Sequence, residues 1–200
     1  IDEADDSSTV DLVYTDHDLL RPDGRTASPV YKPDWSPERL RNHNYITHLV
    51  AARRSLVEEV GGFRAGYDGA QDHDLLLRMS ERARTIVHVP EVLLHWRQSP
   101  ASVATDTARK PEAYEAGRRA VADHLHRIGV DATVDLGDHD GVYRIRRRVT
   151  GMPTVSVVIP TRGSAGRVWG RTRIFVHDAV ASLAAATGGA VRLEFVVVLD

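Results

Sequence analysis

Two runs of β-branched residues near the end of the 200-residue chain restrict the folds that it can adopt. The first run is TVSVVIP at Thr154–Pro160, the second is Leu193–Leu199, and both are almost continuously apolar. Such runs are typical of parallel strands that are buried on both faces. The segment between them, Arg173–Thr187, is predicted to be the helix that crosses from one strand to the next. This order indicates a βαβ unit of an α/β fold, with ligands expected at the carboxyl ends of the strands, where Thr161 and Asp200 lie.

A segment of turn-forming residues, Gly151-Met152-Pro153, precedes this unit. Glycine and proline interrupt regular structure, so the segment is the best candidate for a domain boundary. We therefore predict one domain over residues 1–150 and a second that begins at residue 151 and runs to residue 200.

The composition excludes several functional classes. The chain is 42% hydrophobic and 27% charged, and its net charge of -2 gives no basic surface for nucleic acid. It contains no cysteine, which excludes disulfides and thiolate metal sites and fits a reducing compartment. No apolar run approaches the roughly 20 residues that span a bilayer. We expect a soluble or peripherally bound protein.

The stretch GGFRAGYDGAQDHDLLLR at Gly61–Arg78 is the strongest candidate for a site. Glycines lead to two carboxylates, Asp72 and Asp74, at the start of a helix predicted over Asp72–Arg82. An Asp at or next to the N-cap could simply stabilise the helix, by about 1 kcal/mol. A cap accounts for one acid but not for the second or for the glycines, so the pattern favours Asp72 as a catalytic general base.

A second set of polar residues follows a predicted strand at Val10–Tyr14. Asp16 and Asp18 are two residues apart, so in an extended chain they share a face and could point toward one ligand. Acids are also common where a loop starts, and a structural role for Asp18 is an equal alternative. Further along, Tyr45–Ala52 is predicted to be a buried strand.

A third set, His95-Trp96-Arg97, ends a pair of predicted strands, Thr85–Val89 and Glu91–His95, with a proline between them. The three side chains supply a metal or hydrogen-bond ligand, a stacking face and a phosphate-binding fork. In the last part of the chain, residues 161–170 are predicted to form a polar loop.

With these motifs in place, the chain resembles the bacterial family 2 glycosyltransferases, in particular the long proteins that carry two such domains in tandem. The resemblance rests on five words in the family's order: VYTDHD, YKPDWSPERL, GGFRAGYDGAQDHDLLLR, HVPEVLLHWR and PTVSVVIPTRG. It implies the Rossmann-like GT-A fold, in which residues 1–150 are the acceptor-side half of one domain. Residues 151–200 are then the first βαβ unit of the next domain.

The resemblance also implies roles for individual residues. Asp72 matches the family's inverting base, although Gln71 stands where the family has glutamate, and Asp74 supports the loop or helix. The metal-binding Asp-X-Asp motif of the family lies upstream of VYTDHD, which makes Asp16 and Asp18 acceptor-side residues rather than metal ligands. Trp96 matches a residue on the acceptor side. His95 and Arg97 match residues near the donor diphosphate, and His95 is a candidate metal ligand. Thr161 and Asp200 match the nucleotide site of the second domain.

The implied activity is the transfer of a sugar from a nucleotide-sugar donor to a glycan or lipid-linked acceptor, in polysaccharide assembly at the bacterial cell envelope. It uses a divalent metal, Mg²⁺ or Mn²⁺, bound mainly by residues absent from this segment, and takes place in the cytoplasm or at the inner face of the membrane. Two alternatives stay open. One is a metal-dependent hydrolase that uses the Asp and His motifs, and the other is a non-catalytic carbohydrate-binding or scaffolding segment, which Gln71 keeps open.

Overall fold

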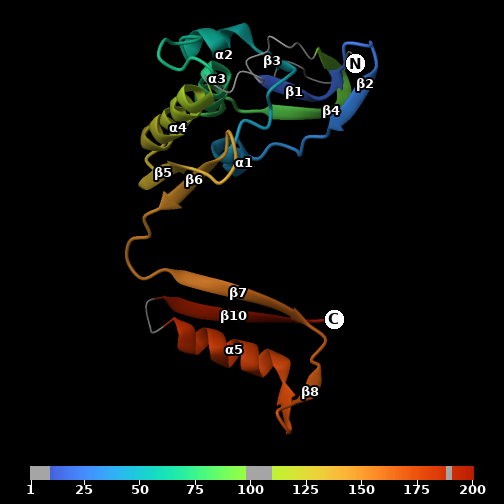
Figure 1. Cartoon of the computed structure of the whole chain (residues 1–200). Coiled ribbons are helices and arrows are strands. Elements are labelled where there is room, and N and C mark those ends of the chain that lie inside the picture. Colours follow the sequence, from blue (N-terminus) through green and yellow to red (C-terminus); the bar gives the residue numbers. More distant parts are fainter. Residues whose placement is uncertain (1–9, 98–109, 188–190) are drawn as a thin grey trace. The chain divides into compact units, whose positions relative to one another are not determined.

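The computed structural model describes residues 10–97, 110–187 and 191–200 of a mixed α/β protein. The chain divides into two compact units, Ile1–Arg148 and Val149–Asp200. The first contains the strands β1 (Leu12–Leu20), β2 (Thr26–Val30), β3 (Val50–Ala52), β4 (Ile86–Arg97), β5 (Ala132–Leu136) and β6 (Tyr143–Arg147), and the helices α1 (Pro37–Asn42), α2 (Arg54–Glu59), α3 (Gln71–Ser80) and α4 (Lys110–Arg127) (Figure 1). No helix in the described ranges is both long and apolar enough to cross a membrane.

Strand β1 is the centre of the main sheet of this unit. Strands β2 and β3 pair with it in antiparallel fashion, and β4 pairs with it in parallel along its whole length. The sequence prediction of two strands on either side of Pro90 is wrong, because β4 is continuous. Its register shifts from Thr15↔Val89 to Asp16↔Val92. The bulge leaves Pro90 out of the ladder, where its missing N–H is tolerated.

Two other predictions about strands need correction. Strand β1 continues to Leu20, so Asp16 and Asp18 lie within the strand and not beyond its end. The predicted strand Tyr45–Ala52 is reduced to β3. Tyr45 and Ile46 are buried as the apolar pattern indicated, but they belong to an irregular segment.

The helix ends follow from local sequence. Ser36 caps α1 by accepting a hydrogen bond from the main-chain N–H of Arg39, as its Ser-Pro-Glu start predicts. Gly61, with φ +80°, follows α2, as predicted for a glycine in the left-handed region. Helix α3 begins at Gln71, one residue earlier than predicted, and its N-cap is Ala70.

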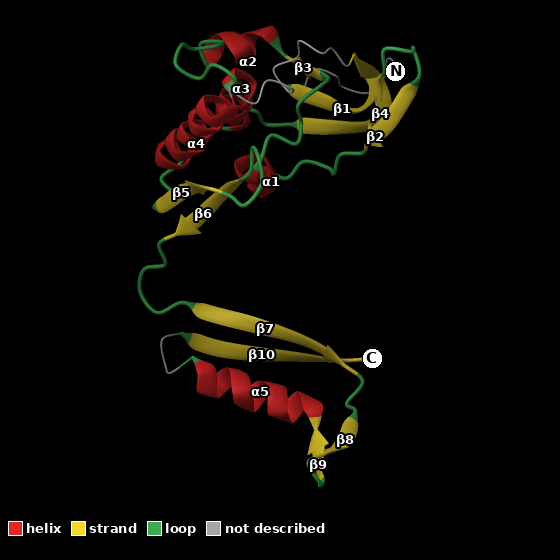
Figure 2. Ribbon diagram, in the orientation of Figure 1, coloured by secondary structure: helices red, strands yellow, loops and turns green. Residues whose placement is uncertain are grey.

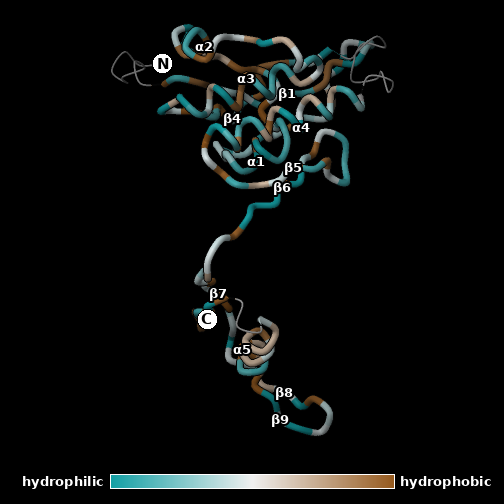
Figure 3. The backbone as a smooth tube through the Cα atoms, turned by 90° about the vertical axis from the view of Figure 1, so that its left-hand side faces the viewer, coloured by the Kyte–Doolittle hydropathy of each residue, from teal (hydrophilic) through white to brown (hydrophobic). Residues whose placement is uncertain are grey.

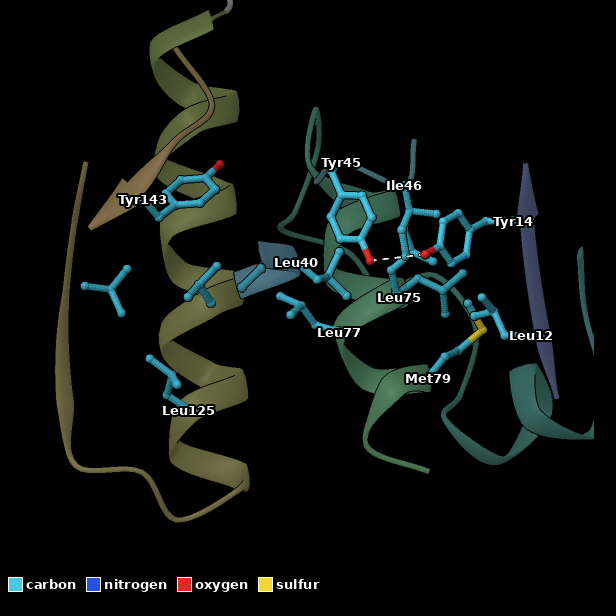
Figure 4. Close-up of a cluster of buried hydrophobic side chains, with 14 of the residues drawn as sticks. Leu12, Tyr14, Leu40, Tyr45, Ile46, Leu75, Leu77, Met79, Leu125 and Tyr143 are labelled. Atoms are coloured by element: carbon cyan, nitrogen blue, oxygen red, sulfur yellow. Dashed lines mark hydrogen bonds between the residues drawn. The ribbon is translucent and has the colours of Figure 1, made fainter. Parts of the chain in front are cut away.

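The core lies between the sheet and the helices (Figure 2). In Figure 4 it runs from β1 across α3 to α4 and β6. Its labelled members include Leu12 and Tyr14 of β1, Leu75, Leu77 and Met79 of α3, Leu125 of α4 and Tyr143 of β6. Strand β6, with the sequence YRIRR, is hydrophilic apart from its inward residues (Figure 3). This core holds the amino end of α3 in place, and with it Asp72.

The second unit contains β7 (Thr154–Thr161), β8 (Ala165–Val168), β9 (Arg171–Ile174), α5 (Phe175–Ala186) and β10 (Arg192–Leu199). Strands β7 and β10 are parallel and joined through α5, which confirms the βαβ prediction. The predicted loop at 161–170 is wrong in part, because β8 and β9 form a hairpin there. Its two turn residues, Trp169 and Gly170, both have positive φ (48° and 77°), the conformation that a two-residue hairpin turn requires.

Burial of β7 on both faces is also wrong for this structure. Val155 is 40% exposed and Val158 is 61% exposed. Within residues 149–187 and 191–200, β7 pairs only with β10, so its other edge and much of its surface stay open to solvent.

Candidate functional site

Asp72 lies in the first turn of α3, two positions after the N-cap, so it does not cap the helix. Its Oδ2 accepts a hydrogen bond from Nδ2 of Asn44 (3.0 Å), and its Oδ1 accepts one from the main-chain N–H of His73 (2.8 Å). The residue is half-buried. A carboxylate offers about four lone-pair positions. Two hydrogen bonds therefore leave it able to accept the proton of a bound hydroxyl, as a general base must.

Asp74 is held differently. It is 1% exposed, and it accepts hydrogen bonds from Arg64 (2.6–3.1 Å) and Arg78 (2.7–2.9 Å). Burial alone would raise the pKa of Asp74, but the hydrogen bonds from the two arginines outweigh it and the pKa lies below its usual range. Arg78 also donates to the carbonyl oxygens of Val60 and Gly62. This network fastens the glycine-rich segment to α3.

A buried aromatic contact between α3 and β6 supports the amino end of α3. The His73 ring stacks on Tyr143 of β6, with centroids 5.7 Å apart, and its Nε2 hydrogen-bonds to the carbonyl oxygen of Leu40 (2.7 Å). Burial lowers the pKa of His73 to about 4 and raises the pKa of Tyr143 to about 12, so both are neutral near pH 7. Gly117 of α4 makes room for the Tyr143 hydroxyl, because a Cβ there would lie 1.8 Å from it.

The segment Asn44–His48, which we name the 44–48 loop, links Asp72 to the main sheet. Asn44 donates to Asp72 and accepts a hydrogen bond from the main-chain N–H of Thr47 (3.3 Å). The buried Lys32 ammonium donates to the carbonyl oxygens of Thr15 and Ile46 (2.5 Å each) and of His48. Burial lowers the pKa of Lys32 to about 8. The loop is therefore fixed at both ends by polar contacts.

The core-facing side of β1 carries Asp16 and Asp18, each bonded to a histidine of β4. Oδ1 of Asp16 accepts hydrogen bonds from Nε2 of His88 (2.8 Å) and from the main-chain N–H of Lys32 (2.9 Å). Oδ1 of Asp18 bonds to Nδ1 of His95 (2.5 Å). Both aspartates are buried, at 2% and 8% exposure. Their hydrogen bonds therefore join β1 to β4.

The opposite face of the β1/β4 pair carries an imidazole–indole cluster, which consists of His17, His48 and Trp96. The Trp96 ring centroid lies 5.3 Å from that of His48 and 6.4 Å from that of His17. Trp96 is 39% exposed, whereas His17 is 6% exposed. Arg97 follows Trp96 at the end of β4 and is exposed.

The described residues do not form a complete metal site. In residues 10–97, 110–187 and 191–200, no three His, Asp or Glu side chains are placed to hold one ion. His95, the candidate ligand, is half-exposed and uses Nδ1 for Asp18, which leaves Nε2 for a ligand. One imidazole nitrogen is too small a donor set for Mg²⁺, which prefers oxygen ligands.

Thr161 and Asp200 of the second unit lie together at the carboxyl ends of β7 and β10. The main-chain N–H of Asp200 donates to the carbonyl oxygen of Thr161 (3.2 Å). Nε of Arg162 lies 3.8 Å from Oδ2 of Asp200, with both side chains more than 80% exposed. Oγ1 of Thr161 accepts a hydrogen bond from the main-chain N–H of Gly163 (3.1 Å). This is the edge where parallel sheets bind ligands.

Sequence reasoning missed several residues of these sites. The sequence gives no role to Asn44, Lys32 or His88, and the strand predicted at Tyr45–Ala52 forms only at β3 and does not include His48. Their contacts join segments that are 16–72 residues apart. A single sequence carries no signal for such pairings.

Comparison with known proteins gives two extended matches. The chain is 44% identical over 149 residues to the O-antigen biosynthesis protein RfbC of Myxococcus xanthus, a match that covers 74% of the chain and 12% of that protein. It is 45% identical over 154 residues to the uncharacterized protein y4gI of Sinorhizobium fredii (strain NBRC 101917 / NGR234), which covers 76% of the chain and 17% of that protein. The chain thus spans less than a fifth of either relative. No family model matches it.

Proposed function

We propose that this chain belongs to an inverting glycosyltransferase of bacterial polysaccharide assembly, with Asp72 as its general base. The observation that carries the proposal is the environment of Asp72. Its carboxylate is half-buried and positioned by a neutral amide and a main-chain N–H, whereas Asp74, two residues on, is engaged by two arginines. The similarity to a protein named for O-antigen biosynthesis supports the polysaccharide context.

The proposed reaction begins with an acceptor hydroxyl hydrogen-bonded to Asp72. The acceptor oxygen attacks the anomeric carbon of the donor sugar as its proton passes to the carboxylate. A new carbon–oxygen bond forms on one face, and the bond to the diphosphate oxygen breaks on the other. The electron pair leaves with the nucleoside diphosphate, and the anomeric configuration inverts.

The finer assignments belong to the same proposal. Residues 1–150 would form the acceptor-side half of a GT-A domain and residues 151–200 the start of a second, with Thr161 and Asp200 at its nucleotide site. His95 and Arg97 would lie toward the donor diphosphate. The proposal includes a divalent cation, which would neutralise the departing diphosphate. The described residues do not gather three His, Asp or Glu side chains to hold it. The reaction would take place in the cytoplasm or at the inner face of the membrane.

The test is the product of the reaction. The protein that carries this chain is incubated with a panel of nucleotide sugars and lipid-linked or oligosaccharide acceptors, and the new glycosidic bond is read by NMR. We expect transfer with inverted anomeric configuration from at least one donor. Retention of configuration would contradict Asp72 as a base in a single displacement.

A non-catalytic carbohydrate-binding segment is the second candidate, and Gln71 in the place of the family's glutamate favours it. Two results together would favour this candidate: glycan binding that is unchanged in Asp72→Asn, and no sugar transfer from any donor by the parent protein. Cleavage of p-nitrophenyl phosphate that survives Asp72→Asn but is lost in Asp16→Asn would instead indicate a hydrolase.

A further inference from the structure

The face of β1/β4 that carries the imidazole–indole cluster contains unpaired polar atoms. Among the described residues, Nδ1 of His17 and Oγ1 of Thr47 are buried and make no hydrogen bond. A buried polar atom without a partner costs roughly 1–3 kcal/mol, so such atoms are uncommon in folded proteins. Thr47 also has a positive φ of 41°, a conformation that is unfavourable for a β-branched residue. His17 lies beside the partly exposed indole of Trp96, and Thr47 precedes His48, whose ring also contacts that indole.

The unpaired nitrogen of His17 can form one hydrogen bond with a ligand. Burial lowers the pKa of His17, and the nearby Lys32 acts in the same direction, so the ring is neutral near pH 7. A neutral imidazole has one N–H and one lone pair, and Nδ1 has no partner among the described residues in either role. A ligand hydroxyl, which both donates and accepts, matches Nδ1 in either tautomer.

The surroundings select the kind of ligand. Trp96, 39% exposed, presents part of an apolar ring, and the rings of His17 and His48 lie against it. The hydroxyl of Thr47, which precedes His48 in the chain, is a second buried polar group without a partner. A sugar ring matches this surface, because it has an apolar face of C–H groups that stacks on aromatic rings and hydroxyls at its edge.

We propose that His17, Thr47, His48 and Trp96 form a binding subsite for one sugar ring, with the ring against Trp96 and a sugar hydroxyl hydrogen-bonded to Nδ1 of His17. The inference rests on the proposed function, in that the bound sugar would belong to the glycan acceptor. The 44–48 loop supplies the connection: it carries Thr47 and His48 at one end and Asn44, which holds Asp72, at the other. Filling the subsite would thus stabilise the loop that positions the proposed base.

The test uses the 200-residue chain labelled with 5-fluorotryptophan. The chain has three tryptophans, so Trp96→Phe and Trp169→Phe variants assign the fluorine resonances. Methyl glycosides of glucose, galactose, mannose, rhamnose and N-acetylglucosamine are titrated up to tens of millimolar. We expect a saturable shift of the Trp96 resonance with at least one glycoside and no shift of Trp169, which is 94% exposed in the second unit.

The decisive variant is His17→Phe, which keeps a ring but removes the unpaired nitrogen. We expect it to bind the glycoside about tenfold more weakly, the effect of losing one hydrogen bond, and to melt at a higher temperature, because an unpaired buried polar atom is gone. The His48 carbonyl keeps its bond to Lys32 in this variant. Unchanged affinity in His17→Phe, or no glycoside that shifts Trp96, would overturn the proposal. A Trp96 shift with uridine diphosphate alone would assign the face to a nucleotide instead.

Two further measurements separate the binding test from the folding of His17→Phe and from the proposed function. If His17→Phe fails to fold by circular dichroism, Trp96→Ala, a change at a partly exposed position, is read by isothermal titration calorimetry and should abolish binding. Asp68→Asn, a change at an exposed residue outside the subsite, should bind the glycoside as the parent does. Binding without any transfer activity in the parent protein would mean that the proposed function fails while the subsite stands, and transfer without binding at Trp96 would mean the reverse.

Discussion

Among single residues, the hydrogen bonds that position the Asp72 carboxylate matter most for the proposed reaction. Asn44 is the side chain that ties Asp72 to the 44–48 loop, through one hydrogen bond to the carboxylate and one from the main chain of Thr47. The sequence predicts a site at this carboxylate, because two acids after a glycine-rich segment form a visible pattern. It does not predict the contact with Asn44, because that contact depends on the path of an irregular loop.

Asn44→Ala removes this support. We expect turnover in the proposed transfer reaction to fall about fivefold, since one hydrogen bond of about 1 kcal/mol is lost. Asp68→Asn, which changes an exposed carboxylate of the neighbouring segment, is the control and should keep its activity. Equal turnover in Asn44→Ala and the parent would show that the loop does not position Asp72.

His73 gives a pH dependence with a definite sign. Its folded-state pKa of about 4 lies below the ordinary value of 6.5, so the unfolded chain binds more protons between these pH values. Stability contributed by the neutral ring is complete above about pH 6.5 and is lost as the pH falls through 4. The free energy of unfolding, measured with urea from pH 7 to pH 4, should fall by up to about 3 kcal/mol from this group.

The matched pair for this prediction is His73→Phe and His126→Phe, because His126 is exposed on α4. His73→Phe should be less stable at pH 7 but less dependent on pH. His126→Phe should keep the dependence of the parent. An unchanged pH slope in His73→Phe would contradict a neutral buried imidazole.

At the scale of elements, the strands and helices that local sequence specifies were predicted, and those that depend on tertiary pairing were not. The Ser-Pro-Glu start of α1 and the glycine after α2 act locally. The continuity of β4 through Pro90 depends on a bulge against β1, and the extension of β1 to Leu20 depends on its partners β2 and β4. The pairing of Asp16 with His88 and of Asp18 with His95 follows from this parallel register, which one sequence does not specify.

The contact between α4 and β6 provides a test at this scale. Alanine in place of glycine inside a helix normally stabilises a protein by about 1 kcal/mol. Gly117→Ala should instead destabilise the chain by about 1–3 kcal/mol, because the new methyl group would overlap the Tyr143 hydroxyl. Thermal and urea unfolding measure the change.

Tyr143→Phe removes the atom that lies closest to the new methyl group. The cost of Gly117→Ala should therefore be smaller in a Tyr143→Phe background than in the parent. A stabilising Gly117→Ala would mean that β6 does not pack against α4 as described.

For the whole molecule, the Gly151-Met152-Pro153 segment predicts a domain boundary. The two compact units divide nearby, between Arg148 and Val149. The buried core cluster belongs entirely to the first unit. Exposure of the apolar residues of β7 and β10 could not be predicted, because the pattern reports what a strand can bury and not what covers it.

This division predicts separate responses to a core change. Leu77, 1% exposed in α3, replaced by alanine should destabilise the first unit by about 2–5 kcal/mol. Amide hydrogen exchange should accelerate in α3 and α4 while the protection of α5 stays as in the parent. Faster exchange of equal size in α5 would show that the two units unfold as one.

We propose that Asp72 takes the proton of the acceptor hydroxyl, and the turnover rate of Asp72→Asn decides this. It is measured with a donor and acceptor that the parent protein uses, alongside Asp68→Asn and a circular dichroism spectrum of each variant. We expect an intact fold, near-parent turnover in Asp68→Asn and a loss of about 10²–10⁴-fold in Asp72→Asn. Turnover in Asp72→Asn within a few-fold of the parent would contradict it.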